Sequence, residues 1–319
     1  MTATTLKRTV CTLFCMCLMV TLMPVAAFSW EAATHAYIEA HLQKMQGRAD
    51  ADVMANRIYG ANAIDIFNFD FTPVSQAFSA YLHDPTQEHF LNVRDNAVSE
   101  SEKAFAYGFV SHNNTWGMDS TAHLSGITLG RGEGYVMAKA RVLAAMLKPI
   151  LESPEIGLYL PDAVLLNICH QMVETGVDFL VRGLDPAIGN TLMQAAYNRS
   201  EAIPGLLVKS FVPDFSGLAG GPENAGQMIR TAEGIFQTRM MAYGWALTQD
   251  NAFDLVADSI ARIAEGFLGL PEGSGAALLP VIQQAMIASM SLCAQDFEQE
   301  LHATTGWVNG NLSSAGITW

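Results

Sequence analysis

The sequence predicts an all-α fold built as a multi-helix bundle. Apolar residues recur with a 3.6-residue period along most of the chain after residue 29, which is typical of amphipathic helices. Alternation of apolar and polar residues, the pattern of strands, is scarce, and residues 126–129 are the best short candidate. No internal repeat is evident. The segments with helical periodicity are residues 31–46, 52–59, 73–82, 88–109, 134–151, 161–182, 187–198, 223–247, 251–267 and 280–303.

Helix-breaking residues mark several of the expected boundaries. Pro161 and Pro280 suit the first turn of a helix, where the missing N–H costs nothing. Gly- and Pro-rich joints at residues 203–221 and 269–275 separate helices and need not separate domains. We expect a catalytic core over residues 30–200, with residues 201–319 as a helical C-terminal extension packed on it. The apolar stretch 276–292 favours a core helix over a membrane contact, because Gln283 and Gln284 interrupt it.

Residues 1–29 have the pattern of a secretion signal and are left out of the expected fold. Lys7 and Arg8 form the positive region, residues 10–20 the apolar region and residues 24–29 a cleavage region rich in small residues. Cleavage after Ala27 and cleavage after Ser29 both fit. A retained membrane anchor is the alternative, but the apolar run is shorter than the ~20 residues that a spanning helix needs. The pattern predicts a secreted or periplasmic protein.

The charge and the cysteines narrow the class of protein. The formal net charge is −14, and every acidic residue follows residue 29. This charge argues against binding of duplex nucleic acid through a basic surface, although bound metals could still supply positive charge locally. Cys169 and Cys293 are the cysteines beyond the leader, and they could form one disulfide or remain two buried thiols. A metal site would therefore have to use histidine and carboxylate ligands.

The segment of residues 112–123 carries the most information about function. On one helix, His112, Asp119 and His123 would fall at i, i+7 and i+11 and share a face. Two imidazoles and a carboxylate on one stripe suit a zinc site better than an apolar core. A buried His–Asp hydrogen-bond network is the alternative. His170 and Glu174, at i and i+4, also share a helical face and strengthen the metal interpretation, with a surface pair as the alternative.

Other candidate ligands are individually weaker. Asp65, flanked by apolar residues, could be a helix or turn cap, and His83 before Asp-Pro could be a loop histidine, with His89 as the competing ligand. Asp178 favours a supporting or solvated role one turn beyond Glu174. We interpret His41 and His302 as ordinary residues, because neither has an acidic partner at ligand spacing.

Several other chemistries lack support in the sequence. Residues 130–134 resemble a phosphate-cradling loop, but they lack the full glycine spacing and a preceding strand. The chain contains neither a Gly-x-Ser-x-Gly motif nor a P-loop. Serine nucleophiles and nucleotide hydrolysis are therefore unsupported.

Taken together, these residues resemble the zinc-dependent phospholipase C family, which is related to the single-strand-specific zinc nucleases. The family is helical, carries three zinc ions, and uses the amine and carbonyl of an N-terminal Trp as ligands. The resemblance covers roughly residues 30–180. In the order of the family's ligands, the matching residues here are Trp30, His35, Asp65, His83, His112, Asp119, His123, His170 and Glu174.

The chain also departs from the family pattern. The family usually places its Asp four residues after the central His, where this chain has Trp116. Asp119 would face the same way one turn later, so the local path must differ. The β-sandwich lipid-binding domain of some toxin members and the substrate loops have no match, and neither does the region after about residue 200.

The resemblance implies a secreted phosphodiesterase, with phospholipase C activity on the glycerol–phosphate bond as the first expectation. Zinc-bound hydroxide would attack phosphorus, and Asp65 would ligate metal and orient or deprotonate the water. The alternatives are a zinc nuclease or phosphomonoesterase, and a zinc-binding protein without turnover. Glu174 favours the phospholipase branch, because the nucleases usually carry Asp there. The expected partners are a phosphodiester substrate and, transiently, a membrane surface, with no obligate protein partner evident.

Overall fold

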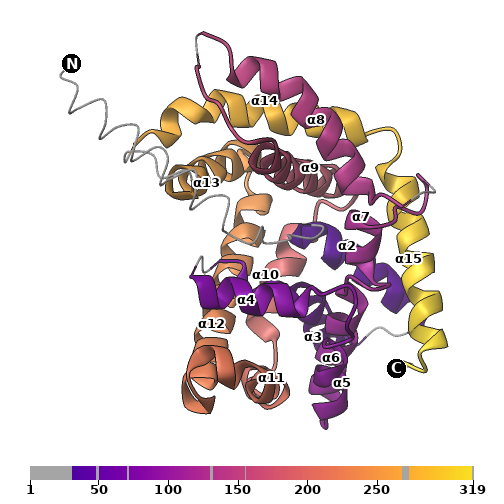
Figure 1. Cartoon of the computed structure of the whole chain (residues 1–319). Coiled ribbons are helices and arrows are strands. Elements are labelled where there is room, and N and C mark those ends of the chain that lie inside the picture. The colour runs from indigo at the N-terminus through magenta and orange to yellow at the C-terminus, as the bar shows by residue number, and fades with distance from the viewer. Residues whose placement is uncertain are drawn as a thin grey trace.

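The computed structural model describes residues 31–47, 50–69, 72–129, 132–154, 156–267 and 273–317. These residues form fourteen α-helices and one 3₁₀ helix, and none of them forms a strand (Figure 1). The all-α prediction is therefore confirmed for this part of the chain. The predicted leader and Trp30 lie outside the described residues. The helices up to residue 200 are α2 (Ala32–Met45), α3 (Ala51–Asn62), η1 (Ala63–Phe67), α4 (Pro73–Leu82), α5 (Leu91–Asn96), α6 (Glu100–His112), α7 (Met118–His123), α8 (Tyr135–Leu151), α9 (Asp162–Leu184) and α10 (Ile188–Asn198).

The region after residue 200 contains five helices, two more than the three that the periodicity predicts. The expected joint at 203–221 is instead mostly helical, because Pro204 lies in the first turn and Gly220 ends the helix in the left-handed conformation. The expected helix over 280–303 is two helices separated at residues 294–296, and Pro280 lies inside the first of them. The helices of this region are α11 (Ile203–Ala219), α12 (Pro222–Thr248), α13 (Ala252–Phe267), α14 (Gly275–Cys293) and α15 (Phe297–Ser314).

Two further expectations are corrected before residue 130. The expected helix over 88–109 is interrupted at residues 97–99, where Ser99 and Glu102 form a capping box that starts α6. Residues 126–129, the best candidate for a strand, form no strand. The backbone N–H groups of Ile127 and Thr128 instead donate to the carboxylate of Glu300 on α15, both at 2.7 Å.

Helix α9 organises the packing. Helices α8 and α14 pack on it and on each other, and α2 contacts α9, α3, α10 and α15 (Figure 1). The pairs α3–α6 and α10–α12 continue the bundle, and α12 also contacts η1. One cluster of buried apolar side chains includes residues from before and after position 200. Helices α2, η1, α6, α7 and α9 are thereby brought to the middle of the molecule, where the candidate ligands lie.

Of the two alternatives for the cysteines, a disulfide or two buried thiols, the structure has the two thiols. Cys169 on α9 and Cys293 on α14 are both free and fully buried. Burial raises the pKa of the Cys169 thiol to about 12, because the thiolate would lose its hydration. Neither cysteine is therefore a reactive nucleophile.

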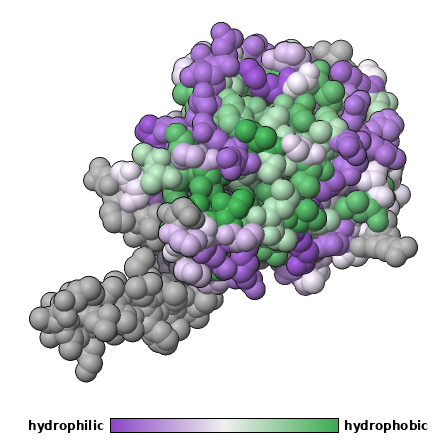
Figure 2. All heavy atoms as spheres, turned by 90° about the horizontal axis from the view of Figure 1, so that it is seen from above, coloured by the Kyte–Doolittle hydropathy of each residue, from purple (hydrophilic) through white to green (hydrophobic). Residues whose placement is uncertain are grey.

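Helices α8 and α14 present an apolar outer face. Two helices, α9 and α14, are long and apolar enough to cross a membrane by length and composition, but α9 is 67% buried over its most apolar window and α14 only 22%. Helix α9 is thus a core helix, while α14 is a surface helix and not the core helix expected for residues 276–292. The exposed apolar side chains include Val142, Met146 and Ile150 on α8 and Ile287 on α14. Figure 2 shows this side from above, with apolar residues gathered centrally and hydrophilic residues around them.

Candidate metal centre

Eight of the nine predicted ligands converge in the structure, and the ninth, Trp30, lies outside the described residues. They form three groups, and within each group the ligand atoms lie within 4.8 Å of one another. The first group is His35, His112 and Asp119; the second is Asp65, His83 and His112; the third is His123, His170 and Glu174.

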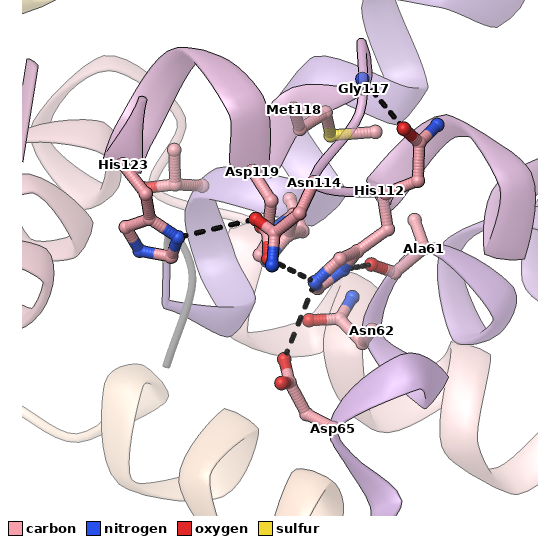
Figure 3. Close-up of polar contacts among 12 residues, drawn as sticks. Ala61, Asn62, Asp65, His112, Asn114, Gly117, Met118, Asp119 and His123 are labelled. Carbon is pink, nitrogen blue, oxygen red and sulfur yellow. Dashed lines mark hydrogen bonds and ion pairs between the residues drawn. The ribbon is translucent and has the colours of Figure 1, made fainter. Parts of the chain in front are cut away.

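The path from His112 to Asp119 differs from the expected single helix. Helix α6 ends at His112 and α7 begins at Met118, so the two ligands lie on different helices. In the connection, the Asn113 side-chain oxygen accepts the N–H groups of Thr115, Trp116 and Gly117 at 2.8–3.1 Å. Figure 3 shows the bond from Gly117. A Cβ at Gly117 would lie 2.6 Å from the backbone of Asn113, so only glycine fits this turn. The turn thus directs Asp119 toward His112 without a continuous helical stripe.

The first group lies deepest in the protein. The Asp119 carboxylate lies between two histidines, with Oδ2 at 3.0 Å from His112 Nε2 and Oδ1 at 3.4 Å from His35 Nε2. The rings of His35 and His112 stack with centroids 4.3 Å apart. All three residues have no exposed surface. Three potential ligands from three separate helices, α2, α6 and α7, therefore meet in a site closed to solvent.

The second group shares His112 with the first and reaches the surface through Asp65. Asp65 Oδ1 lies 3.1 Å from His83 Nε2, and Asp65 Oδ2 lies 3.8 Å from His112 Nε2. Asn68 donates to Asp65 Oδ1 at 2.6 Å and accepts from Ser79, which fixes the orientation of the carboxylate. The Asp65 side chain is 16% exposed, whereas those of Asp119 and Glu174 are 0% exposed. Asp65 is therefore the carboxylate of the three groups that solvent can reach.

The third group joins α7 to α9. His123 Nε2 and His170 Nε2 face each other at 2.9 Å, and Glu174 Oε1 lies 2.7 Å from His170 Nε2 and 3.3 Å from His123 Nε2. The spacing of His170 and Glu174 places them on one face of α9, as the sequence predicts. Two neutral imidazole nitrogens aimed at one point repel each other unless a proton or a cation lies between them. This arrangement suits a metal ligand set.

The second nitrogen of each of two histidines is fixed by a backbone carbonyl. His112 Nδ1 donates to the carbonyl of Ala61 at 2.6 Å (Figure 3). His83 Nδ1 donates to the carbonyl of Ser79 at 2.8 Å. Because a carbonyl can only accept, Nδ1 carries the hydrogen in both rings and Nε2 is left to bind a cation. This second hydrogen bond is the usual support of a metal-binding histidine.

Burial and the nearby carboxylates perturb the ionisable groups strongly. For His112, burial lowers the pKa, but Asp119 and Asp65 outweigh it and raise the pKa to about 9. For His35, burial and the neighbouring His112 lower the pKa to about 4. Burial raises the pKa of Glu174 to about 8. Such opposed shifts within one small volume are a feature of functional sites.

The donor atoms fit zinc ions. Both oxygens of Asp119 and Nε2 of His112 are buried, and none of them makes a hydrogen bond with the described residues, although the two side chains approach within 3.0 Å. A buried carboxylate without hydrogen bonds is costly unless a cation lies beside it, and for Asp119 this cation is either the protonated His112 ring or a metal ion bound by both side chains. Histidine nitrogen and carboxylate oxygen are the ligands that zinc takes in place of cysteine. The three groups could therefore each hold a metal ion.

The remaining histidines lie apart from the three groups. His89, the competing ligand, stacks on Tyr81 with ring centroids 3.8 Å apart. His41 bonds to the carbonyl of Tyr37 in its own helix, and His302 is exposed. Residues 130 and 131 of the glycine-rich loop lie outside the described residues. At Gly134, a Cβ would lie 2.1 Å from the carbonyl oxygen of Ala122, so this glycine permits close packing of α8 on α7.

Two further polar residues support the site. Asn114 donates to the carbonyl of His83 at 3.0 Å, and its side-chain oxygen lies 3.4 Å from His123 Nδ1. Asn114 thus links the second and third groups. The sequence analysis did not select Asn114, although its position between His112 and His123 is a signal that could have identified it. Asp178 is completely buried and bonded to the first turn of α2. Asp178 is therefore not a solvated charge, and of the two expected roles the supporting role agrees with its contacts.

Comparison of the chain with protein-family models, with curated proteins and with solved structures finds no match.

Proposed function

We propose that this protein is a secreted zinc-dependent phosphodiesterase, a phospholipase C that hydrolyses the glycerol–phosphate bond of phospholipids. The observation that carries the proposal is the convergence of the three His and carboxylate groups, in which His112 belongs to two groups and Asp119 bridges two histidines. Shared ligands bring metal ions close together, as hydrolysis of phosphate esters by several metals requires. The order of these residues along the chain is also that of the phospholipase C family.

The chain's own residues have separate roles in this proposal. His35, His83, His112, His123 and His170 would hold zinc through a ring nitrogen, with Asp65, Asp119 and Glu174 as carboxylate ligands, and Trp30 would complete the set. When bound, zinc would activate a water molecule at neutral pH and offset the negative charge that develops on the phosphoryl group.

Asp65 is the proposed catalytic residue. Its carboxylate is oriented by Asn68 and is the one that solvent reaches, so it is placed to accept a proton from a water molecule beside the substrate. Asp119 and Glu174 are fully buried, which suits them to ligation and excludes them from contact with bulk water. No side-chain nucleophile is needed, in agreement with the two buried, inert thiols.

The apolar outer face supports phospholipid as the substrate class. Val142, Met146 and Ile150 are spaced by four residues on α8 and are 42–48% exposed. Helix α14 beside them contains no charged residue. An enzyme that takes its substrate from a bilayer has to approach the lipid surface, and an apolar face favours transient contact of that kind.

The proposal is tested on the secreted, processed protein. We expect about three zinc ions per chain and hydrolysis of phosphatidylcholine to diacylglycerol and phosphocholine. Removal of zinc with a chelator should abolish hydrolysis and added zinc should restore it, because the activated water requires the metal.

The substrate panel should also contain single-stranded nucleic acid and a phosphate monoester. Hydrolysis of these alone would assign a nuclease or phosphomonoesterase. Zinc binding without any turnover would assign a binding protein, and full activity after verified removal of zinc would exclude the metal mechanism.

A further inference from the structure

Asp178 is a buried carboxylate that the proposed chemistry does not use. It lies on α9 one turn after Glu174, so His170, Glu174 and Asp178 at i, i+4 and i+8 share one face of the helix. Its side chain has no exposed surface. A buried carboxylate has to be compensated, and here the compensation comes from α2 and α12.

Among the described residues, four hydrogen bonds end on this carboxylate. Oδ2 accepts the backbone N–H of Ala33 at 2.8 Å and the hydroxyl of Tyr243 at 2.9 Å. Oδ1 accepts the backbone N–H of Thr34 at 2.7 Å and the Thr34 hydroxyl at 2.6 Å. The first N–H groups of a helix have no i−4 partner, and the side chain of the N-cap residue of α2, Glu31, supplies no bond. The Thr34 N–H also reaches the Glu31 carbonyl at 3.0 Å, so the Ala33 N–H depends most on Asp178. Asp178 therefore caps α2 from a helix about 145 residues further along the chain.

We infer that Asp178 is a positioning residue that sets the place of His35 relative to the third group. His35 directly follows Thr34, and its Nε2 approaches Asp119 Oδ1 at 3.4 Å. Because the same face of α9 carries His170 and Glu174, one helix places two of the three residues of the third group and, through Asp178, the end of α2 that carries His35. Zinc–nitrogen bonds are ~2.0–2.1 Å long, so a small shift of α2 would weaken the first group. This inference rests on the proposed metal centre.

Glu300 provides a matched control. It is also fully buried, and its carboxylate accepts two backbone N–H groups, from Ile127 and Thr128, together with the Thr128 hydroxyl. The hydrogen-bonding pattern is nearly that of Asp178. The segment that Glu300 fixes, however, contains none of the eight converging ligands. A general loss of stability would affect both carboxylates alike, whereas positioning of His35 involves Asp178 alone.

The experiment compares Asp178→Asn with Glu300→Gln in the processed protein. Zinc affinities and the visible absorption of the cobalt-substituted protein are measured for each metal. In Asp178→Asn, we expect one of the three metals to bind about 10–100-fold more weakly, the usual effect of removing a support of a ligand, and to lose its cobalt signal. Glu300→Gln should keep all three affinities, even where its thermal stability falls equally.

Two variants that perturb the structure less are used in case Asp178→Asn does not fold. Tyr243→Phe and Thr34→Ala each remove one hydrogen bond and should weaken the same metal to a lesser degree. Unchanged affinities in both, or equal weakening in Asp178→Asn and Glu300→Gln, would overturn the inference. Failure of the proposed function would be visible in the wild-type protein as zinc binding without hydrolysis, and the comparison of metal affinities would be unaffected by it.

Discussion

The first two groups of candidate ligands differ from the third group in how they are built. The first two share His112 and contain two carboxylates, one fully buried and one that solvent reaches. The third shares no residue with them, contains one buried carboxylate, and is built from α7 and α9 alone. Under the proposed function, the two groups that share His112 would hold the metals that act on the substrate, and the third group would hold a separate metal ion.

The largest effect is expected at Asp65. Asp65→Asn keeps the size of the side chain but removes the carboxylate that solvent reaches, so turnover should fall by about 10²–10⁴-fold, the usual contribution of a general base. The fold should change little, because Asp65 is partly exposed. Turnover and thermal unfolding are measured together. Asp214→Asn is the control, since Asp214 bonds to Tyr81 and lies outside the three groups; equal losses in both variants would contradict the assignment.

A second effect concerns how many metals each histidine holds. His112 belongs to two groups and His170 to one, and both are at least 95% buried. His112→Asn should therefore reduce zinc by about two ions per chain and His170→Asn by about one, if each group loses its ion with a ligand. Metal analysis of dialysed, folded samples gives both numbers. Equal losses would show that His112 is not shared.

The sequence predicted which side chains converge better than it predicted the path of the chain between them. Zinc chemistry favours histidine and carboxylate side chains, and the resemblance to the zinc-dependent family selected the eight residues that the structure brings together. The helical stripe through His112 and Asp119 was wrong, because Asn113 and Gly117 end α6 and start a turn. These two residues are turn formers, and their local signal was present in the sequence.

Other parts of the structure depend on contacts between distant residues. The caps that Asp178 gives to α2 and Glu300 gives to residues 127 and 128 join positions more than 140 apart, so no local pattern reports them. The helix Ile203–Ala219 was missed for the opposite reason. Its prolines and glycines have the composition of a joint, but buried Leu207, Phe211 and Phe215 hold it against the core. Tertiary packing outweighed local propensity there.

The amino terminus should affect one metal only. A free Trp30 can offer its amine as a ligand, whereas a chain that retains Phe28 and Ser29 offers a peptide nitrogen, which is a very poor ligand. We expect the extended form, refolded and saturated with zinc, to bind about one ion fewer and to be much less active than the processed form. Zinc per chain and turnover are measured side by side. Equal values would leave Trp30 as an ordinary aromatic residue.

The smallest effect is a release of protons on zinc binding, and it should differ between ligands of one group. Without metal, the raised pKa of His112, about 9, and of Glu174, about 8, leaves both groups protonated at pH 7. The lowered pKa of His35, about 4, leaves that ring neutral. Zinc binds the deprotonated ligand, so binding at pH 7 should release on the order of two protons from these groups, and affinity should rise from pH 7 to 9 and then level off.

Calorimetric titration with zinc in two buffers of different ionisation enthalpy measures this release. His112→Asn should release about one proton fewer at pH 7, because the proton on its imidazole is gone, while His35→Asn should leave the number unchanged although it also removes a ligand. A release that is the same at pH 7 and at pH 9.5 would contradict the argument. An equal decrease in the number of released protons in His35→Asn and in His112→Asn would also contradict it. The two stacked rings would then titrate alike despite their different carboxylate neighbours.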